Sequence, residues 1–149
     1  MEEFIRVPYG STVHGEEEID AVINVLKTTT QMSKNVREFE SKVAAKYSKD
    51  YGIMVNSGSS ALYLSIESLN LPMGSEVITP ALTFGTTVAS IVNNKLVPVF
   101  VDVKPDTYCI DETQIESKIT KNTSAIVAPD LMGNICEWPY IRELADKHN

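Results

Sequence analysis

The stretch Val55-Asn56-Ser57-Gly58-Ser59-Ser60-Ala61-Leu62 decides the fold, because it leads from an apolar segment into a helix through small residues. The N–H groups in the first turn of a helix have no partner inside the helix, and the helix dipole places partial positive charge there. A phosphate can bind such a turn through backbone N–H groups alone, and small side chains let it approach closely. Serine and glycine are also common at helix starts, so a simple N-capping serine remains the alternative.

Apolar runs alternate with helical patterns from the middle of the chain to its end. The predicted strands are Ile53–Asn56, Glu76–Thr79, Val97–Val101 and Ala125–Ala128. The predicted helices are Ser59–Leu69, Thr86–Asn93, Glu112–Ile119 and a last one that opens at Trp138-Pro139. Short strands that are apolar at nearly every position are typical of parallel sheets covered by helices on both faces. We therefore expect an α/β fold, a three-layer αβα arrangement with a mostly parallel sheet.

The remaining patterns set the domain organisation. Two amphipathic helices, Glu16–Lys27 and Val36–Tyr47, precede the sheet, and Asp111 with Gln114 predicts a capping box before the third helix of the series. Without an internal repeat or linker, the chain is expected to be one unit, with helices in residues 1–50 and a βαβ series in residues 51–149. The last helix has no glycine cap and no following strand, so we expect a further strand and a truncated carboxyl end.

Composition and charge narrow the class of protein. With 149 residues, 43% of them hydrophobic, the chain can build a core of its own. Thirteen Lys and Arg against twenty Asp and Glu leave a net charge of −7, and the absence of a basic stripe argues against nucleic acid. The apolar runs are too short to span a bilayer, and Met1-Glu2-Glu3-Phe4 lacks the basic region of a signal peptide. We expect a cytoplasmic protein without a membrane partner.

The cysteine and histidine positions suggest no metal. Cys109 and Cys136 do not form a CxxC motif, and His14 and His148 stand at opposite ends of the chain. Neither a zinc site nor a disulfide framework is indicated, and the cysteines are expected to be thiols.

Ligands of open α/β sheets bind outside the carboxyl ends of the strands. Phe84 follows the second predicted strand, where its ring can stack on a flat heteroaromatic cofactor, although packing under the sheet is the alternative. Asp102 can bind a cofactor hydroxyl or cap the next turn. Asp130 either points toward the same crevice or is a solvated loop carboxylate.

Several motifs in register carry a family resemblance. They are Arg37-Glu38-Phe39-Glu40, Asn56-Ser57-Gly58-Ser59-Ser60-Ala61-Leu62, Gly74-Ser75-Glu76-Val77-Ile78-Thr79-Pro80, Thr83-Phe84 and Pro98-Val99-Phe100-Val101-Asp102-Val103. Over residues 7–149 the chain resembles the amino-terminal half of the DegT/StrS-type nucleotide-sugar aminotransferases. The resemblance implies the first half of the large, cofactor-binding domain of a fold type I enzyme that uses pyridoxal 5'-phosphate. It also implies amino transfer, with glutamate as the usual donor, to a nucleotide-linked keto-deoxysugar, by an enzyme that is a homodimer at full length.

The resemblance assigns roles to four residues. In the family, backbone N–H groups of the serine-rich turn hold the cofactor phosphate, which implies this role for Gly58, Ser59 and Ser60. The aromatic residue after the second strand stacks on the pyridine ring, which implies that role for Phe84. Ser75 and Asp130 depart from the Asp and His common in the family.

The catalytic residues of the family are expected beyond Asn149. Pyridoxal chemistry needs a carboxylate on the pyridinium nitrogen and a Schiff-base lysine, and none of the ten lysines here occupies that place. The chain alone is therefore expected to be inactive. A 3-dehydratase of the same family, which uses the aminated cofactor, is one alternative. A non-catalytic domain that binds a phosphate compound or a subunit is the other.

Overall fold

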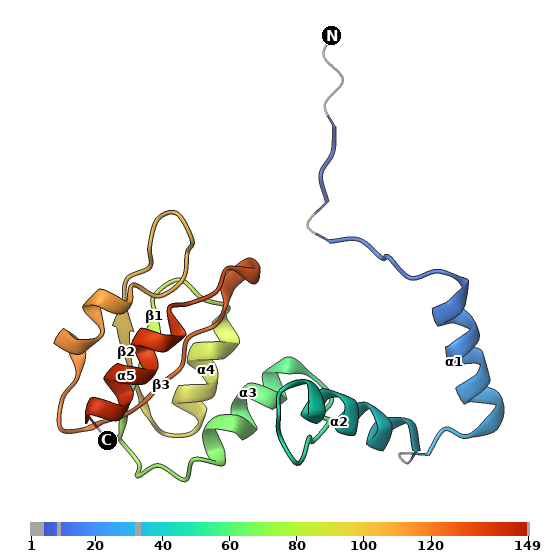
Figure 1. The fold of residues 1–149 in the computed structure, drawn as a ribbon, viewed down its shortest axis with the longest axis horizontal. Helices are drawn as coiled ribbons and strands as arrows, with labels where there is room; N and C mark the ends of the chain where they lie inside the picture. The colour runs from blue at the N-terminus through green and yellow to red at the C-terminus, as the bar shows by residue number, and fades with distance from the viewer. Residues whose placement is uncertain (1–4, 9, 32–33, 149) are drawn as a thin grey trace. The chain divides into compact units, whose positions relative to one another are not determined.

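The computed structural model describes residues 5–8, 10–31 and 34–148. Contacts divide the chain into two compact units, residues 1–54 and residues 55–149, and each is described by itself (Figure 1). The Met1–Phe4 stretch used above lies outside the described residues. No helix of the described part is long and apolar enough to cross a membrane.

The first unit contains the two helices expected before the sheet, α1 (Glu16–Thr28) and α2 (Lys34–Lys46). No residue of α1 is buried; Val25 is partly buried, and the apolar residues Ile19, Val22, Ile23 and Leu26 are exposed. The segment after α2 folds back on it, since the Met54 N–H donates to Glu40 Oε1 at 2.8 Å. Gly52 lies so close to α2 that an added Cβ would stand 2.7 Å from the Glu40 carbonyl oxygen.

The second unit is built on a parallel sheet. Its strands are β1 (Glu76–Pro80), β2 (Val97–Val101) and β3 (Thr123–Ile126), in the order β2-β1-β3. Ile78 at the centre of β1 pairs with Val99 on one side and Ile126 on the other. The parallel pairing confirms the α/β prediction.

Helices cover both faces of this sheet (Figure 1). On one face, Val77 packs with Ile66 of α3 (Gly58–Glu67) and Ile91 of α4 (Gly85–Asn93). On the other, Ile78 packs with Ile141 of α5 (Trp138–His148). Neighbouring residues of a strand point to opposite faces, so β1 contributes side chains to the hydrophobic clusters on both faces of the sheet. The arrangement is therefore αβα in three layers.

The predicted strand Ile53–Asn56 is wrong. This segment has no regular secondary structure and belongs to no ladder of the described residues, and the Ile53 side chain is 85% exposed. An extended segment becomes a strand only when a neighbour satisfies its backbone N–H and C=O groups, and apolar composition alone does not supply that neighbour.

The predicted helix Glu112–Ile119 is also wrong in type. Two 3₁₀ turns, η1 (Glu112–Gln114) and η2 (Glu116–Lys118), stand there instead. Asp111 caps η1 by accepting from the Thr113 N–H at 3.1 Å, but the Asp111 N–H donates to the Asp102 carbonyl at 2.9 Å. The reciprocal bond of a capping box is thus unavailable to Gln114.

Candidate functional site

The first turn of α3 is N-capped by Ser57. Ser57 Oγ accepts from the Ser60 N–H at 3.1 Å, and Ser60 Oγ donates to Asn56 Oδ1 at 2.6 Å. The N–H groups of Gly58 and Ser59 make no hydrogen bond within the described part of the chain. The serine-rich turn therefore both caps the helix and leaves two N–H donors free.

A groove of about 390 Å³ runs between α3 and α4 and reaches the first turns of both helices. Its lining is rich in hydroxyl and amide groups: Ser59, Ser60, Tyr63, Leu64, Thr86, Ala89, Ser90 and Asn93. A Cβ added to Gly58 or to Gly85, the first residues of the two helices, would meet nothing within 4 Å. The space beside both helix starts is therefore open to a ligand.

Phe84 stands one residue before α4 and is 70% exposed, so it does not pack under the sheet. It is absent from the lining of the groove. Its ring is accessible to a flat ligand lying outside the groove near the start of α4.

Two threonine hydroxyls pair at the start of α4, and a third threonine is buried in β1. Thr83 Oγ1 donates to Thr87 Oγ1 at 3.0 Å, whereas Thr79 Oγ1, fully buried near the carboxyl end of β1, has no hydrogen-bond partner among the described residues. The sequence motifs assign no individual role to Asn56, Thr79 or Thr86. A polar residue at the end of an apolar run is the signal that would have drawn attention to Asn56 and Thr79.

Both candidate carboxylates are engaged in their own loops. Asp102 Oδ1 accepts from the Val103 N–H at 2.8 Å. Asp130 Oδ1 accepts from the Cys136 N–H at 2.9 Å and from Trp138 Nε1 at 3.0 Å. The Cys136 N–H, followed by the Trp138 indole, holds the pKa of Asp130 below its usual value. Turn stabilisation accounts for both residues.

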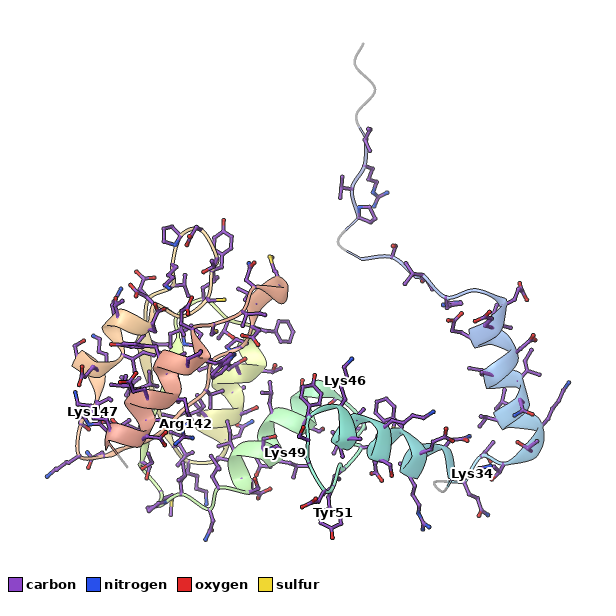
Figure 2. All side chains as sticks on the ribbon, in the orientation of Figure 1. Lys34, Lys46, Lys49, Tyr51, Arg142 and Lys147 are labelled. Atoms are coloured by element: carbon purple, nitrogen blue, oxygen red, sulfur yellow. The ribbon has the colours of Figure 1, made fainter. Side chains whose placement is uncertain are left out.

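No described lysine is buried without a charge partner. Lys34, Lys46, Lys49 and Lys147 are exposed (Figure 2), as are the others except Lys104. Lys104 is half-buried and pairs with Glu112 at 2.6 Å, and this hydrogen bond raises the pKa of Lys104. A lysine activated as a nucleophile needs a lowered pKa, and the hydrogen bond to Glu112 shifts the pKa of Lys104 in the opposite direction.

A larger groove, of about 830 Å³, lies elsewhere in the second unit. It is lined by residues of β3 and α5, among them Ser124, Ile126, Ile141 and Arg142. Within the described residues β3 pairs only with β1, so this groove lies along the unpaired edge of the sheet. The helix start at this groove is Trp138 of α5, whose N–H already donates to the Cys136 carbonyl at 2.7 Å and is followed by Pro139, which has no N–H. The smaller groove at α3 is therefore the better candidate for an anion.

The chain is similar to proteins of one family. Residues 12–149 match the model of the DegT/DnrJ/EryC1/StrS aminotransferase family. The chain is 32% identical, over 95% of its length, to the spore coat polysaccharide biosynthesis protein SpsC of Bacillus subtilis. It is 36% identical, again over 95% of its length, to a dTDP-4-dehydro-2,6-dideoxy-D-glucose 3-dehydratase of Saccharopolyspora spinosa.

A solved structure shows the same fold. The putative sugar aminotransferase Spr1654 from Streptococcus pneumoniae, in its PMP form, superposes with a TM-score of 0.88 and 26% identity over 97% of this chain. The chain covers 37% of SpsC, 32% of the dehydratase and 37% of the pneumococcal protein, so it spans about a third of their length. The family match extends over nearly the whole chain. The chain therefore belongs to the DegT/DnrJ/EryC1/StrS aminotransferase family.

Proposed function

We propose that this chain is the amino-terminal part of a sugar aminotransferase that uses pyridoxal 5'-phosphate and moves an amino group from glutamate to a nucleotide-linked keto-deoxysugar. The observation that carries the proposal is the first turn of α3, where the N–H groups of Gly58 and Ser59 are free beside open space. Membership of the family, and the PMP form of the pneumococcal relative, support the choice of cofactor.

In this proposal the start of α3 binds the cofactor phosphate. Gly58 and Ser59 donate backbone N–H groups, and Ser60, whose N–H already donates to Ser57 Oγ, takes part in the same turn. The exposed ring of Phe84 stacks on the pyridine ring. The bound cofactor supplies the electron sink for amino transfer, while these residues only hold and orient it.

The proposal places the catalytic lysine and the acidic partner of the pyridinium nitrogen outside residues 1–149. The exposed or paired lysines described above support this division. Borohydride reduction of the isolated chain with cofactor, followed by peptide mass spectrometry, is expected to give scattered lysine adducts and no stoichiometric one. A single stoichiometric adduct on one lysine of this chain would contradict it.

Replacing Gly58 tests the phosphate site directly. In the full-length protein, Gly58→Val fills the open space beside α3, and cofactor affinity should fall about tenfold or more, as when a charge-assisted hydrogen bond worth roughly 1.5–3 kcal/mol is lost. The melting temperature without cofactor should stay close to that of the parent, because the new side chain meets no neighbour. Gly15→Val, at the N-cap of α1, adds the same side chain at another helix start and is the matched control. Unchanged affinity in Gly58→Val would refute the assignment.

Product analysis separates the proposal from its alternatives. The similarity to the named 3-dehydratase keeps deoxygenation as a second candidate. Full-length protein is given glutamate, cofactor and a keto-deoxysugar nucleotide. Amination with conversion of glutamate to its keto acid supports the aminotransferase, loss of the sugar hydroxyl supports the dehydratase, and neither reaction supports a non-catalytic binding domain.

We also propose that the full-length protein is a cytoplasmic homodimer. Exposed apolar residues along α1, including Val22 at 60% and Leu26 at 67% exposure, offer surface that subunit contacts can cover. Light scattering on the full-length protein measures the mass in solution. A monomer over a wide concentration range would contradict the proposal.

A further inference from the structure

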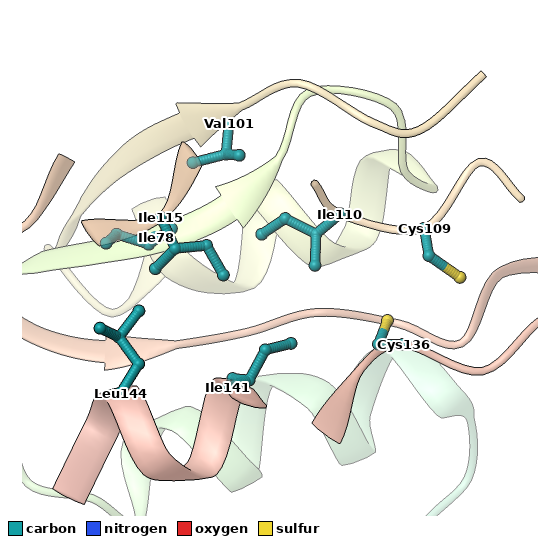
Figure 3. Close-up of a cluster of buried hydrophobic side chains, with 8 residues drawn as sticks. All are labelled: Ile78, Val101, Cys109, Ile110, Ile115, Cys136, Ile141 and Leu144. Atoms are coloured by element: carbon teal, nitrogen blue, oxygen red, sulfur yellow. The ribbon is translucent and has the colours of Figure 1, made fainter. Parts of the chain in front are cut away.

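Two cysteines that are distant in the sequence share one part of the core. Cys109 lies in the loop after β2, and Cys136 lies just before α5. Both are free thiols, 3% and 4% exposed, and both belong to the hydrophobic cluster around Ile78. Figure 3 shows both side chains in the space between the segment that carries Cys109 and the segment that carries Cys136.

Hydrogen bonds hold the two loops together beside the thiols. Asn134 Nδ2 donates to the Thr107 carbonyl at 2.8 Å, and Cys109 Sγ donates back to the Asn134 carbonyl at 3.3 Å. On the other side, the Cys136 N–H donates to Asp130 Oδ1 at 2.9 Å. The backbone next to each sulfur is thus tied in place, so both thiols are held in the same part of the core.

Neither attack on a substrate nor metal binding fits the surroundings of the two thiols. Burial, followed by the neighbouring Cys109, raises the pKa of Cys136 to about 12, so this thiol is protonated at neutral pH and is a poor nucleophile toward substrate. No group of three or more His, Cys, Asp or Glu side chains able to hold a metal ion exists among the described residues. Two thiols that share one cluster, close enough for Cys109 to raise the pKa of Cys136, leave reaction with each other as the remaining chemistry.

We propose that Cys109 and Cys136 form a reversible intramolecular disulfide, with a low-molecular-weight disulfide such as oxidised glutathione as the oxidant. One cysteine thiolate attacks a sulfur of the oxidant, the S–S bond of the oxidant breaks, and the first glutathione leaves and takes up a proton. The second cysteine loses its proton and attacks the mixed disulfide, which releases the second glutathione. Two protein thiols are oxidised to one disulfide, and one glutathione disulfide is reduced to two thiols.

The disulfide joins two loops with a common position in the sheet. Residues 102–111 follow the carboxyl end of β2, and residues 127–137 follow the carboxyl end of β3. Parallel strands end at the same edge, where ligands of such sheets bind. The bond therefore restrains two ligand-side loops. Because both thiols are buried, it forms over minutes to hours.

The experiment measures the equilibrium between the protein disulfide and the glutathione redox pair. This equilibrium gives the effective concentration of one cysteine thiol relative to the other. Full-length protein is equilibrated with mixtures of reduced and oxidised glutathione, starting both from reduced protein and from protein oxidised with diamide, and the two series must converge. Samples are acid-quenched, alkylated in denaturant and digested without reductant, and mass spectrometry quantifies the Cys109–Cys136 cross-linked peptide. The same titration in concentrated urea gives the reference for the unfolded chain.

The expected result is an effective concentration at least about tenfold higher in the native protein than in urea. The variants Cys109→Ser and Cys136→Ser should give a glutathione adduct or a free thiol at the remaining cysteine and no cross-link. A ratio below tenfold, or linkage of either cysteine to another molecule or to a different cysteine, would overturn the proposal. Neither cofactor binding nor activity enters the measurement, so the outcome is independent of the proposed function.

Discussion

Val77 and Ile78 are adjacent on β1, yet their side chains enter two separate hydrophobic clusters on opposite faces of the sheet. Both side chains are 0% exposed. Val77 contacts the layer that contains α3 and α4, and Ile78 contacts the layer that contains α5. Two neighbouring residues thus connect all three layers of the second unit through the pleat of one strand.

Truncation of Ile78 should strongly destabilise the second unit. Ile78→Ala removes a fully buried side chain between Val101 and Leu144, and its cost is expected to be about 2–5 kcal/mol in the free energy of unfolding. Urea denaturation followed by Trp138 fluorescence measures it. Ile135→Ala, at a side chain 74% exposed, is the control and should change stability by less than about 0.5 kcal/mol. Equal effects of the two variants would contradict the assigned core.

Thr79 in β1 and Thr87 in the first turn of α4 should respond with opposite sign to substitution by valine. Thr79→Val removes a buried hydroxyl that has no hydrogen-bond partner in the described residues, so stability should rise by about 1 kcal/mol. Thr87→Val removes the acceptor of the Thr83 hydroxyl, so stability should fall by about 1 kcal/mol. Urea denaturation of both variants provides the comparison. Destabilisation by Thr79→Val would show that its hydroxyl has a partner in solution.

The N-cap of α3 should contribute measurable stability. Ser57→Ala removes the acceptor of the Ser60 N–H and is expected to cost about 0.5–2 kcal/mol. Ser65→Ala serves as the control, because the Ser65 hydroxyl donates only to the Ala61 carbonyl inside the same helix and its loss should be close to neutral. Hydrogen exchange of the α3 amides reports the local effect. Faster exchange in the Ser65 variant than in the Ser57 variant would contradict the capping role.

Asp130 should make the stability depend on pH in the acid range. The folded pKa of Asp130 lies below the unfolded value of about 3.9, so its contribution is present above that value and is lost as the pH falls through the folded pKa. The stability difference between the parent and Asp130→Asn should therefore be constant near neutral pH and should shrink below about pH 4. Trp138 fluorescence detects unfolding close to the hydrogen bond itself.

The control for this pH dependence is Asp106→Asn, at an exposed turn residue of the same unit. This variant removes the same charge as Asp130→Asn without removing a carboxylate that accepts hydrogen bonds from Cys136 and Trp138. If the two variants behaved alike, the effect would belong to overall charge and not to the hydrogen bonds that Asp130 accepts from Cys136 and Trp138.

Local sequence patterns were sufficient to predict the helices and strands whose hydrophobic periodicity is clear. The predicted helices over residues 16–27, 36–47, 59–69 and 86–93 correspond to α1, α2, α3 and α4, each within a few residues. The predicted strand Val97–Val101 matches β2, whereas β3 begins two residues before the predicted Ala125. Ser57 also behaves as the local sequence indicates, because a cap needs only a residue and the turn that follows it.

The structure of the other segments depends on contacts with residues that are distant in the sequence. The segment Ile53–Asn56 has the composition of a strand but no ladder in the described residues, and the hydrogen bond from Asp111 to the Asp102 carbonyl replaced the expected capping box. The free N–H groups at Gly58 and Ser59 were predictable from the helix start, and they are what the sequence by itself determined about the candidate site. Only the tertiary structure decided that the space beside Gly58 is open, that the Thr79 hydroxyl lacks a partner and that Asp130 is engaged in its own loop. The physical reason is that hydrogen bonds and packing between segments distant in the chain depend on where the fold brings them, and no local pattern records that position.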